Sequence, residues 1–81
     1  MLVAHTPHEI HEEFPEHAEK IHALKLNDAH FAKIADTYHE VNREIHRLET
    51  RVETSSEEYE EGLRKKRLHL KDEISALLAR G

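Results

Sequence analysis

The chain has 81 residues, of which 36 % are charged and 5 % are aromatic, and its formal net charge is −5. This length allows one small domain at most, and so few aromatic residues leave too little bulk for a core of several layers. The acidic balance argues against general nucleic-acid binding. No apolar run approaches the roughly 20 residues of a membrane span, and the start of the chain does not resemble a secretory signal. The absence of cysteine fits a reducing, cytoplasmic location.

The first 13 residues are rich in histidine, and we expect residues 1–13 to be a flexible or partly helical extension. A short helix is predicted there with Thr6 as its cap, Pro7 in its first position and Glu9 closing a capping box. This helix should stop or kink before Pro15, because proline disfavours helical geometry in the residue that precedes it. A second helix is predicted over about residues 15–26, and whether the two are continuous through Pro15 stays open.

The apolar residues of the central stretch recur at alternating steps of three and four, which is typical of a helix packed lengthwise against another helix. We expect this helix at about residues 29–52, with Asn27 or Asp28 as its cap. The residues of its apolar seam are Phe31, Ile34, Tyr38, Val41, Ile45, Leu48 and Val52.

A third helix is predicted at about residues 56–79. Ser55 with Glu58, or Thr54 with Glu57, forms a capping box at its start. Acidic residues fill its first turns and basic residues follow, which matches the helix dipole. The residues of its seam are Tyr59, Leu63, Leu70, Ile74 and Leu77.

The short connection between the two long helices makes them antiparallel neighbours. In the matching register Leu48 lies opposite Leu63, and Val41 lies opposite Leu70. The seam skips a turn at Lys66 and Arg67, whose aliphatic stems can cover apolar neighbours. The predicted fold is all-α, an antiparallel two-helix coiled-coil hairpin preceded by a short N-terminal helix, with residues 14–81 as one domain.

Several stretches carry a family resemblance: His30–Phe31 after the predicted cap, the segment IHRLE at residues 45–49, and the segment LRKKRLHLKDEI at residues 63–74. In these stretches the chain resembles the YdcH-like family of small bacterial proteins, a domain of unknown function. The resemblance covers about residues 14–79. It implies a short helix that leads into a long helical hairpin, and it implies no activity, catalytic residue or cofactor.

The sequence offers no catalytic constellation, because it has no cysteine nucleophile and no glycine-rich phosphate loop. We therefore expect neither an enzyme nor a cofactor, and no small-molecule substrate. The expected role is a protein–protein interaction or scaffold module that forms a homo-oligomer or docks an unknown protein partner. The predicted partner-binding residues are Arg67, Leu68 and Leu78, since the two leucines lie off the seam and the arginine fills its skipped turn. Replacing Arg67 with leucine should then stabilise the helix pair and loosen its oligomeric specificity.

Two alternatives stay open. One is a metal- or pH-responsive regulator, in which the histidines at positions 5, 8 and 11 share the N-terminal extension. Protonation of all nine histidines would carry the formal charge from −5 to +4. The structural alternative for these residues is a solvated polar terminus, and we assign no metal site. The other is nucleic-acid binding through Arg64–Arg67, a basic run that has acidic neighbours and no interleaved aromatic residues.

Overall fold

The computed structural model describes residues 7–50 and 55–80, and within these ranges it contains helices and no strand. The elements in chain order are α1 (Ile10–Glu13), the 3-10 turn η1 (Pro15–His17), α2 (Ala18–Asn27), α3 (Ala29–Glu49) and α4 (Glu57–Ala79). This order confirms the predicted all-α hairpin. Across the two described ranges, no helix combines the length and the apolar character that a bilayer crossing requires.

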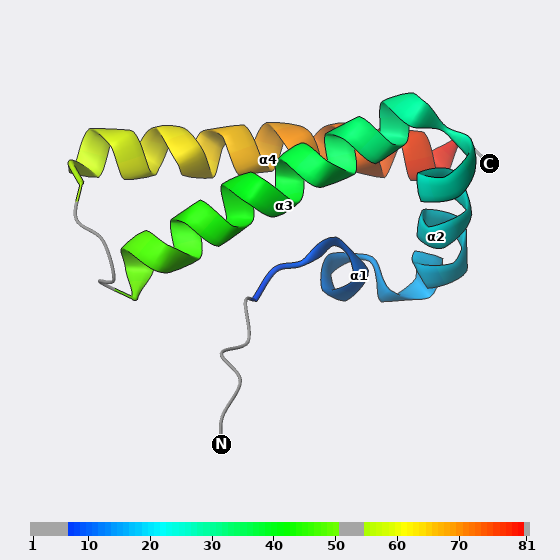
Figure 1. Cartoon of the computed structure of the whole chain (residues 1–81), viewed down its shortest axis with the longest axis horizontal. Helices are drawn as coiled ribbons and strands as arrows, with labels where there is room; N and C mark the ends of the chain where they lie inside the picture. The colour runs from blue at the N-terminus through cyan, green and yellow to red at the C-terminus, as the bar shows by residue number, and fades with distance from the viewer. Residues whose placement is uncertain (1–6, 51–54, 81) are drawn as a thin grey trace, which may run out of the picture.

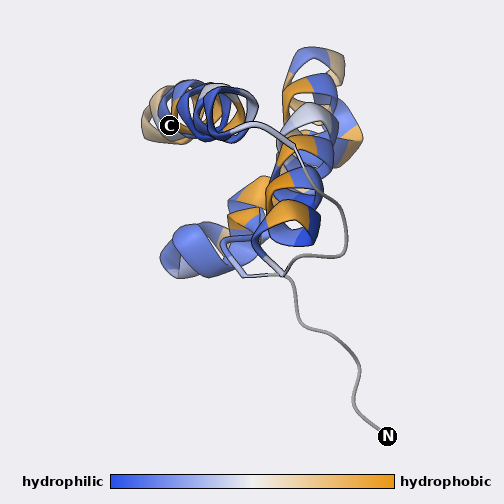
Figure 2. Cartoon of the chain, turned by 90° about the vertical axis from the view of Figure 1, so that its left-hand side faces the viewer, coloured by the Kyte–Doolittle hydropathy of each residue, from blue (hydrophilic) through white to orange (hydrophobic). Residues whose placement is uncertain are grey.

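The two long helices run in opposite directions and cross obliquely, so that the end of α3 and the start of α4 diverge (Figure 1). At the other end of the hairpin, α2 lies across the two helices, and α1 returns to the middle of α3. Each of the other α-helices therefore packs against α3. Figure 2 shows hydrophobic positions recurring along α3, whereas the N-terminal half of α4, which faces the viewer, is mostly hydrophilic.

The seam predicted for α3 is confirmed at every described position. Its six residues from Phe31 to Leu48 are between 0 and 7 % exposed, and Val52 lies outside the described residues. Two further α3 residues, Ala35 and Asn42, are also buried. They lie one residue after Ile34 and Val41, so the buried face of α3 is wider than a two-per-heptad seam.

The buried face of α4 differs from the prediction at both ends. Leu70 and Ile74 are buried as expected, but Leu78 is only 3 % exposed and Tyr59 is 50 % exposed. The expectation that Leu78 forms an exposed edge is therefore wrong. The reason is that the two helices cross obliquely. The buried residues of α4 therefore recur every four residues, at Leu70, Ile74 and Leu78. At the end of α4, Lys20 of α2 donates a hydrogen bond to the Leu78 carbonyl, which draws this end toward α2.

Two contacts between the long helices test the predicted register. Arg64 Nη2 lies 3.1 Å from Glu49 Oε2, and these residues directly follow the predicted partners Leu63 and Leu48. Nearer the middle of the hairpin, Arg67 contacts Asn42. The register of the hairpin agrees with the predicted one, although the axes of the two antiparallel helices diverge toward the end of α3 and the start of α4.

Side-chain caps fix the helix starts. The Oδ1 atom of Asp28 accepts hydrogen bonds from the backbone N–H groups of His30 at 3.0 Å and Phe31 at 3.1 Å. Of the two predicted caps for α3, Asp28 is therefore the one used. The cap of α4 is Ser56, whose hydroxyl accepts from the Tyr59 N–H at 3.1 Å. The predicted Ser55 cap is thus wrong by one residue.

The N-terminal pieces are separate helices. The break before Pro15 is confirmed, since α1 ends at Glu13 and η1 begins at Pro15. The cap of α1 is Glu9, which forms a capping box with Glu12, so the helix starts later than the predicted Thr6–Pro7 start. Thr6 itself lies outside the described residues.

Candidate functional site: a polar cluster at the hairpin

The densest set of polar contacts lies where the N-terminal segment meets the two long helices. Asn42 of α3 is 1 % exposed. Its Nδ2 donates to the Pro7 carbonyl at 2.7 Å and to Glu9 Oε2 at 3.0 Å, and its Oδ1 accepts from Arg67 Nη1 at 2.8 Å. One buried amide therefore joins three segments of the chain. We call these four residues, Asn42, Arg67, Pro7 and Glu9, the Asn42 cluster.

One turn earlier on α3, Tyr38 holds the same N-terminal segment. Its hydroxyl donates to the His8 carbonyl at 2.6 Å. His8 has a φ of 64°, in the left-handed region that non-glycine residues rarely adopt. Such a conformation persists only where neighbouring contacts hold it, and the Tyr38 hydrogen bond is one of them. Burial, reinforced by the charge of Glu13, raises the pKa of Tyr38 to about 12.

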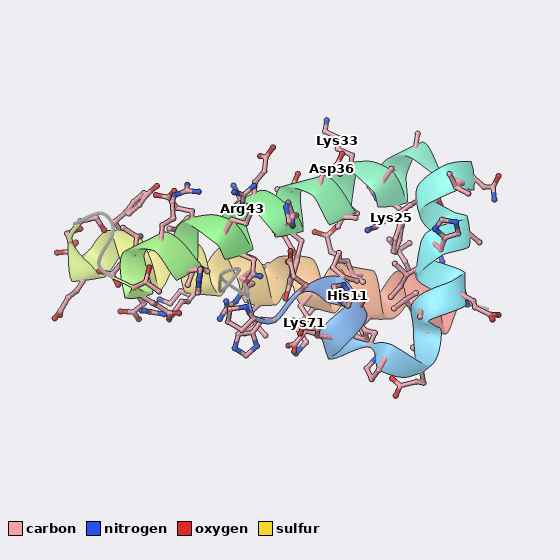
Figure 3. The ribbon with its side chains drawn as sticks, turned by 60° about the horizontal axis from the view of Figure 1, so that its bottom comes forward. His11, Lys25, Lys33, Asp36, Arg43 and Lys71 are labelled. Atoms are coloured by element: carbon pink, nitrogen blue, oxygen red, sulfur yellow. The ribbon has the colours of Figure 1, made fainter. Side chains whose placement is uncertain are left out.

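Side-chain contacts to glutamates complete the attachment of residues 7–13. Lys71 Nζ of α4 lies 2.7 Å from Glu13 Oε1 (Figure 3). The hydrogen bond from Lys71 lowers the pKa of Glu13 against the opposing effect of burial. His39 Nδ1 lies 2.6 Å from Glu9 Oε1, and His8 Nδ1 lies 3.5 Å from Glu13 Oε2. Residues 7–13 are thus packed against the hairpin, with α1 as their helical part.

The three predicted partner-binding residues do not share one surface. Arg67 is partly buried in the Asn42 cluster, Leu68 is 60 % exposed, and Leu78 belongs to the hydrophobic core. Arg67 and Leu68 both line a hollow of about 250 Å³, together with side chains from the N-terminal segment and α3. Its full lining is His8, Glu13, Tyr38, Arg64, Arg67, Leu68 and Lys71.

Asn42 was not identified as a site residue from the sequence. The signal that could have indicated it is its position directly after the seam residue Val41, on the side of α3 that also carries Ala35 and Tyr38. An asparagine on the buried face of a helix needs partners for its amide. The sequence does not say which residues supply them.

The structure describes two of the three histidines of the metal alternative, His8 and His11. His8 lies against Glu13, His11 is exposed, and His5 lies outside the described residues. Within residues 7–50 and 55–80, no group of three or more histidine, aspartate or glutamate side chains is placed to hold a metal ion.

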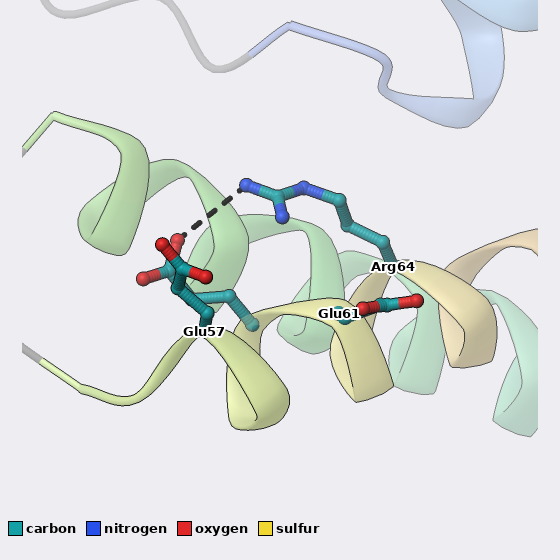
Figure 4. A pocket seen from close by; sticks show the side chains of 4 residues that line it. Glu57, Glu61 and Arg64 are labelled. Atoms are coloured by element: carbon teal, nitrogen blue, oxygen red, sulfur yellow. Dashed lines mark hydrogen bonds and ion pairs between the residues drawn. The ribbon is translucent and has the colours of Figure 1, made fainter.

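Two residues of the basic run of α4, Arg64 and Lys65, pair with acids from their own chain. Arg64 contacts Glu49 and also Glu60, at 3.5 Å, and Lys65 Nζ lies 3.6 Å from Glu61 Oε1. Figure 4 shows the hollow of about 390 Å³ beside this run, where Arg64 reaches over the carboxylates of the first turns of α4. The hollow is lined by Glu57, Glu60, Glu61 and Arg64.

Comparison with known proteins gives a family and no relative of known activity. No curated protein and no solved structure matches the chain. A family model described as "Protein of unknown function (DUF465)" matches residues 31–78, which is more than half of the chain and includes nearly all of α3 and α4. This match agrees with the YdcH-like resemblance of the sequence. The chain therefore belongs to the DUF465 family of small helical proteins of unknown function.

Proposed function

We propose that this protein is a non-enzymatic interaction module that self-associates and acts as a scaffold. The observation that carries the proposal is the gradient of burial along α4. Ile74 is 0 % and Leu70 is 8 % exposed, Leu63 is partly buried, and Tyr59 is 50 % exposed. The apolar stripe of α4 therefore extends beyond the part that α3 covers. An apolar helical stripe that is left uncovered is a surface that a second helix can bury.

A second copy of the chain is the proposed occupant of this stripe. A chain of 81 residues has a small core, and small domains commonly gain stability by oligomerisation. Of the partner-binding residues predicted from the sequence, Leu68 stays available on the surface, whereas Arg67 and Leu78 are engaged within the chain. The surface favoured by the burial gradient is the one formed by Tyr59 and Leu63.

Sedimentation equilibrium of the full chain over a range from micromolar to millimolar tests self-association. The apparent mass is expected to rise from 9.5 kDa toward twice that value with concentration. Replacing Tyr59 with serine should weaken the association. A matched control is Leu26→Ser, because Leu26 is 72 % exposed but lies on α2. A mass that stays at the monomer value over the whole range contradicts the proposal. The variant Leu68→Ser shows whether the other exposed edge of α4 contributes.

A further inference from the structure

In the first half of α4 the acidic residues come first and the basic residues follow, so two such helices in opposite directions have complementary charges. Four acidic residues precede the point between Gly62 and Leu63, and four basic residues follow it. The acidic residues are Glu57, Glu58, Glu60 and Glu61, and the basic residues are Arg64, Lys65, Lys66 and Arg67. A second copy of α4 that lies antiparallel about this point places acids beside bases. A parallel copy in register would place like charges together, which is unfavourable.

We propose that two copies of the chain pair through antiparallel α4 helices, with the two-fold axis passing between Gly62 and Leu63. The proposal rests on the self-association proposed above and names its surface. A two-fold axis makes the interface self-complementary, because each residue meets the same partner from both sides. In this register Gly62 lies opposite Leu63 of the second copy, and Tyr59 lies opposite Lys66 of the second copy.

The residues that meet in this register form one stripe on α4. Tyr59, Gly62, Leu63 and Lys66 have the spacing i, i+3, i+4 and i+7, which places them on one helical face. Leu63 is partly buried and packs against the edge of its own core, and the other three are exposed. Three of the four positions are therefore accessible on the single chain, and Leu63 is accessible in part.

Gly62 provides room for a close approach. A Cβ atom built at this position meets no neighbouring atom of residues 7–50 and 55–80 within 4 Å, so these residues leave the space beside it open. Glycine in a helix interior is less favourable than alanine, and no contact among the described residues requires the absence of a Cβ atom at position 62. An open position opposite Leu63 of the second copy lets that side chain fill the space, as a knob fills a hole in a coiled coil.

The flanking charges can exchange partners between copies. Tyr59 would contact the aliphatic stem and the ammonium group of Lys66 of the second copy. On the solvent side, Glu58 would lie near Lys65 of the second copy. Within the single chain, the side chains of Lys65 and Glu61 are 77 % and 68 % exposed, and exposed pairs of this kind contribute little. Their present pairing therefore does not oppose the new one.

Disulfide trapping tests the register directly, because the chain has no cysteine of its own. The variants Tyr59→Cys and Lys66→Cys are oxidised separately and as a mixture, with a small tag on one of them to identify mixed dimers. The mixture is expected to form a disulfide between the two variants. Each variant alone should link slowly, because two copies of one position would be offset by about 10 Å along the pair, beyond the reach of a disulfide.

The other outcomes overturn the proposal in distinguishable ways. Rapid linking of Lys66→Cys to itself would indicate parallel helices and overturn the register. A dimer seen by sedimentation without the mixed disulfide would overturn this surface and leave self-association standing. A monomer at every concentration would overturn both proposals.

Gly62→Gln provides a second test that does not depend on cysteine. Glutamine is a good helix former, and its Cβ meets no neighbouring atom in the part of the chain that the structure describes, so the single chain should fold. The dissociation constant of the dimer should rise by about tenfold or more, because the added side chain occupies the space of Leu63 of the second copy. The control is Ala76→Gln, which changes an exposed residue of the same helix about 21 Å away. An unchanged dissociation constant for Gly62→Gln would overturn the proposed interface.

Discussion

Arg67 on α4 donates a hydrogen bond of 2.8 Å from its Nη1 atom to Oδ1 of Asn42 on α3, inside the interface between the two long helices. The amide that accepts it is 1 % exposed. The arginine interrupts the apolar seam of α4, and the asparagine adds a polar group to the buried face of α3. This hydrogen bond satisfies the buried Oδ1 of Asn42, while its Nδ2 donates to the Pro7 carbonyl and to Glu9.

The first prediction reverses the one made from the sequence alone. Arg67→Leu is expected to destabilise the protein by about 1–3 kcal/mol, because the buried Oδ1 of Asn42 loses its donor. The change in the free energy of unfolding is measured by urea denaturation. If the variant is more stable than the parent chain, the free energy gained by burying the leucine exceeds the free energy lost with the hydrogen bond.

The double variant Asn42→Leu/Arg67→Leu serves as the control for this prediction. It removes both partners, so its cost should be smaller than the sum of the two single costs, with a coupling of about 0.5–3 kcal/mol. Additive costs would mean that the two side chains act independently. Part of the cost of Asn42→Leu should persist in the double variant, because the Pro7 carbonyl also loses its donor.

The hairpin could be predicted because its signals are local. The alternation of three and four residues along α3 marks a single continuous helical face, and six of the predicted seam residues are buried. The Asp28 cap and the break before Pro15 depend on neighbours within a few residues. Such patterns need no knowledge of what packs against the helix.

The Asn42 cluster could not be predicted because its partners are far apart in the sequence. Arg67 is 25 residues from Asn42, and Tyr38 is 30 residues from the carbonyl that it binds at His8. Polar residues usually lie on the surface, so their type alone predicts exposure. The burial of Leu78 and the exposure of Tyr59 depend on the oblique crossing of the helices, which no spacing along one helix encodes.

The second prediction concerns the ionisation of Tyr38. The chain has two tyrosines, so the variant Tyr59→Phe leaves Tyr38 as the only one. Its tyrosinate absorbance should rise with a midpoint near the pKa of about 12 that burial imposes. Because the folded state favours the neutral phenol, this group stabilises the protein fully below pH 10.0, and the contribution is lost as pH rises from there toward 12. A midpoint of 10.0 would mean that the phenol is not buried.

Tyr38→Phe checks the hydrogen bond of the same residue. Its loss leaves the His8 carbonyl without this donor and should cost about 1 kcal/mol at neutral pH. Above pH 10 the cost should shrink, because the phenylalanine variant has no phenol to titrate. Urea denaturation at both pH values measures the two quantities.

The third prediction concerns acid. Lys71 lowers the pKa of Glu13 from its ordinary value of 4.5. A carboxyl whose pKa is lower in the folded state stabilises the protein above pH 4.5, and this contribution is lost as pH falls through the folded-state pKa. The difference in unfolding free energy between the parent chain and Glu13→Gln should therefore shrink as pH falls below 4.5. Lys71→Gln should show the same pH dependence, whereas a difference that is constant from about pH 3 to pH 7 would contradict the pairing.

The fourth prediction separates two adjacent serines at the start of α4. The hydroxyl of Ser56 accepts a hydrogen bond from the Tyr59 N–H at 3.1 Å, so Ser56→Ala should cost about 1 kcal/mol. The hydroxyl of Ser55 makes only a 3.3 Å contact with the Ser56 carbonyl, which caps no helix N–H group. Ser55→Ala should therefore change the free energy of unfolding by less than about 0.5 kcal/mol. Both values come from urea denaturation of the full chain under one condition. If Ser55→Ala is the costlier change, then α4 begins one residue earlier, at the cap that its sequence pattern predicts.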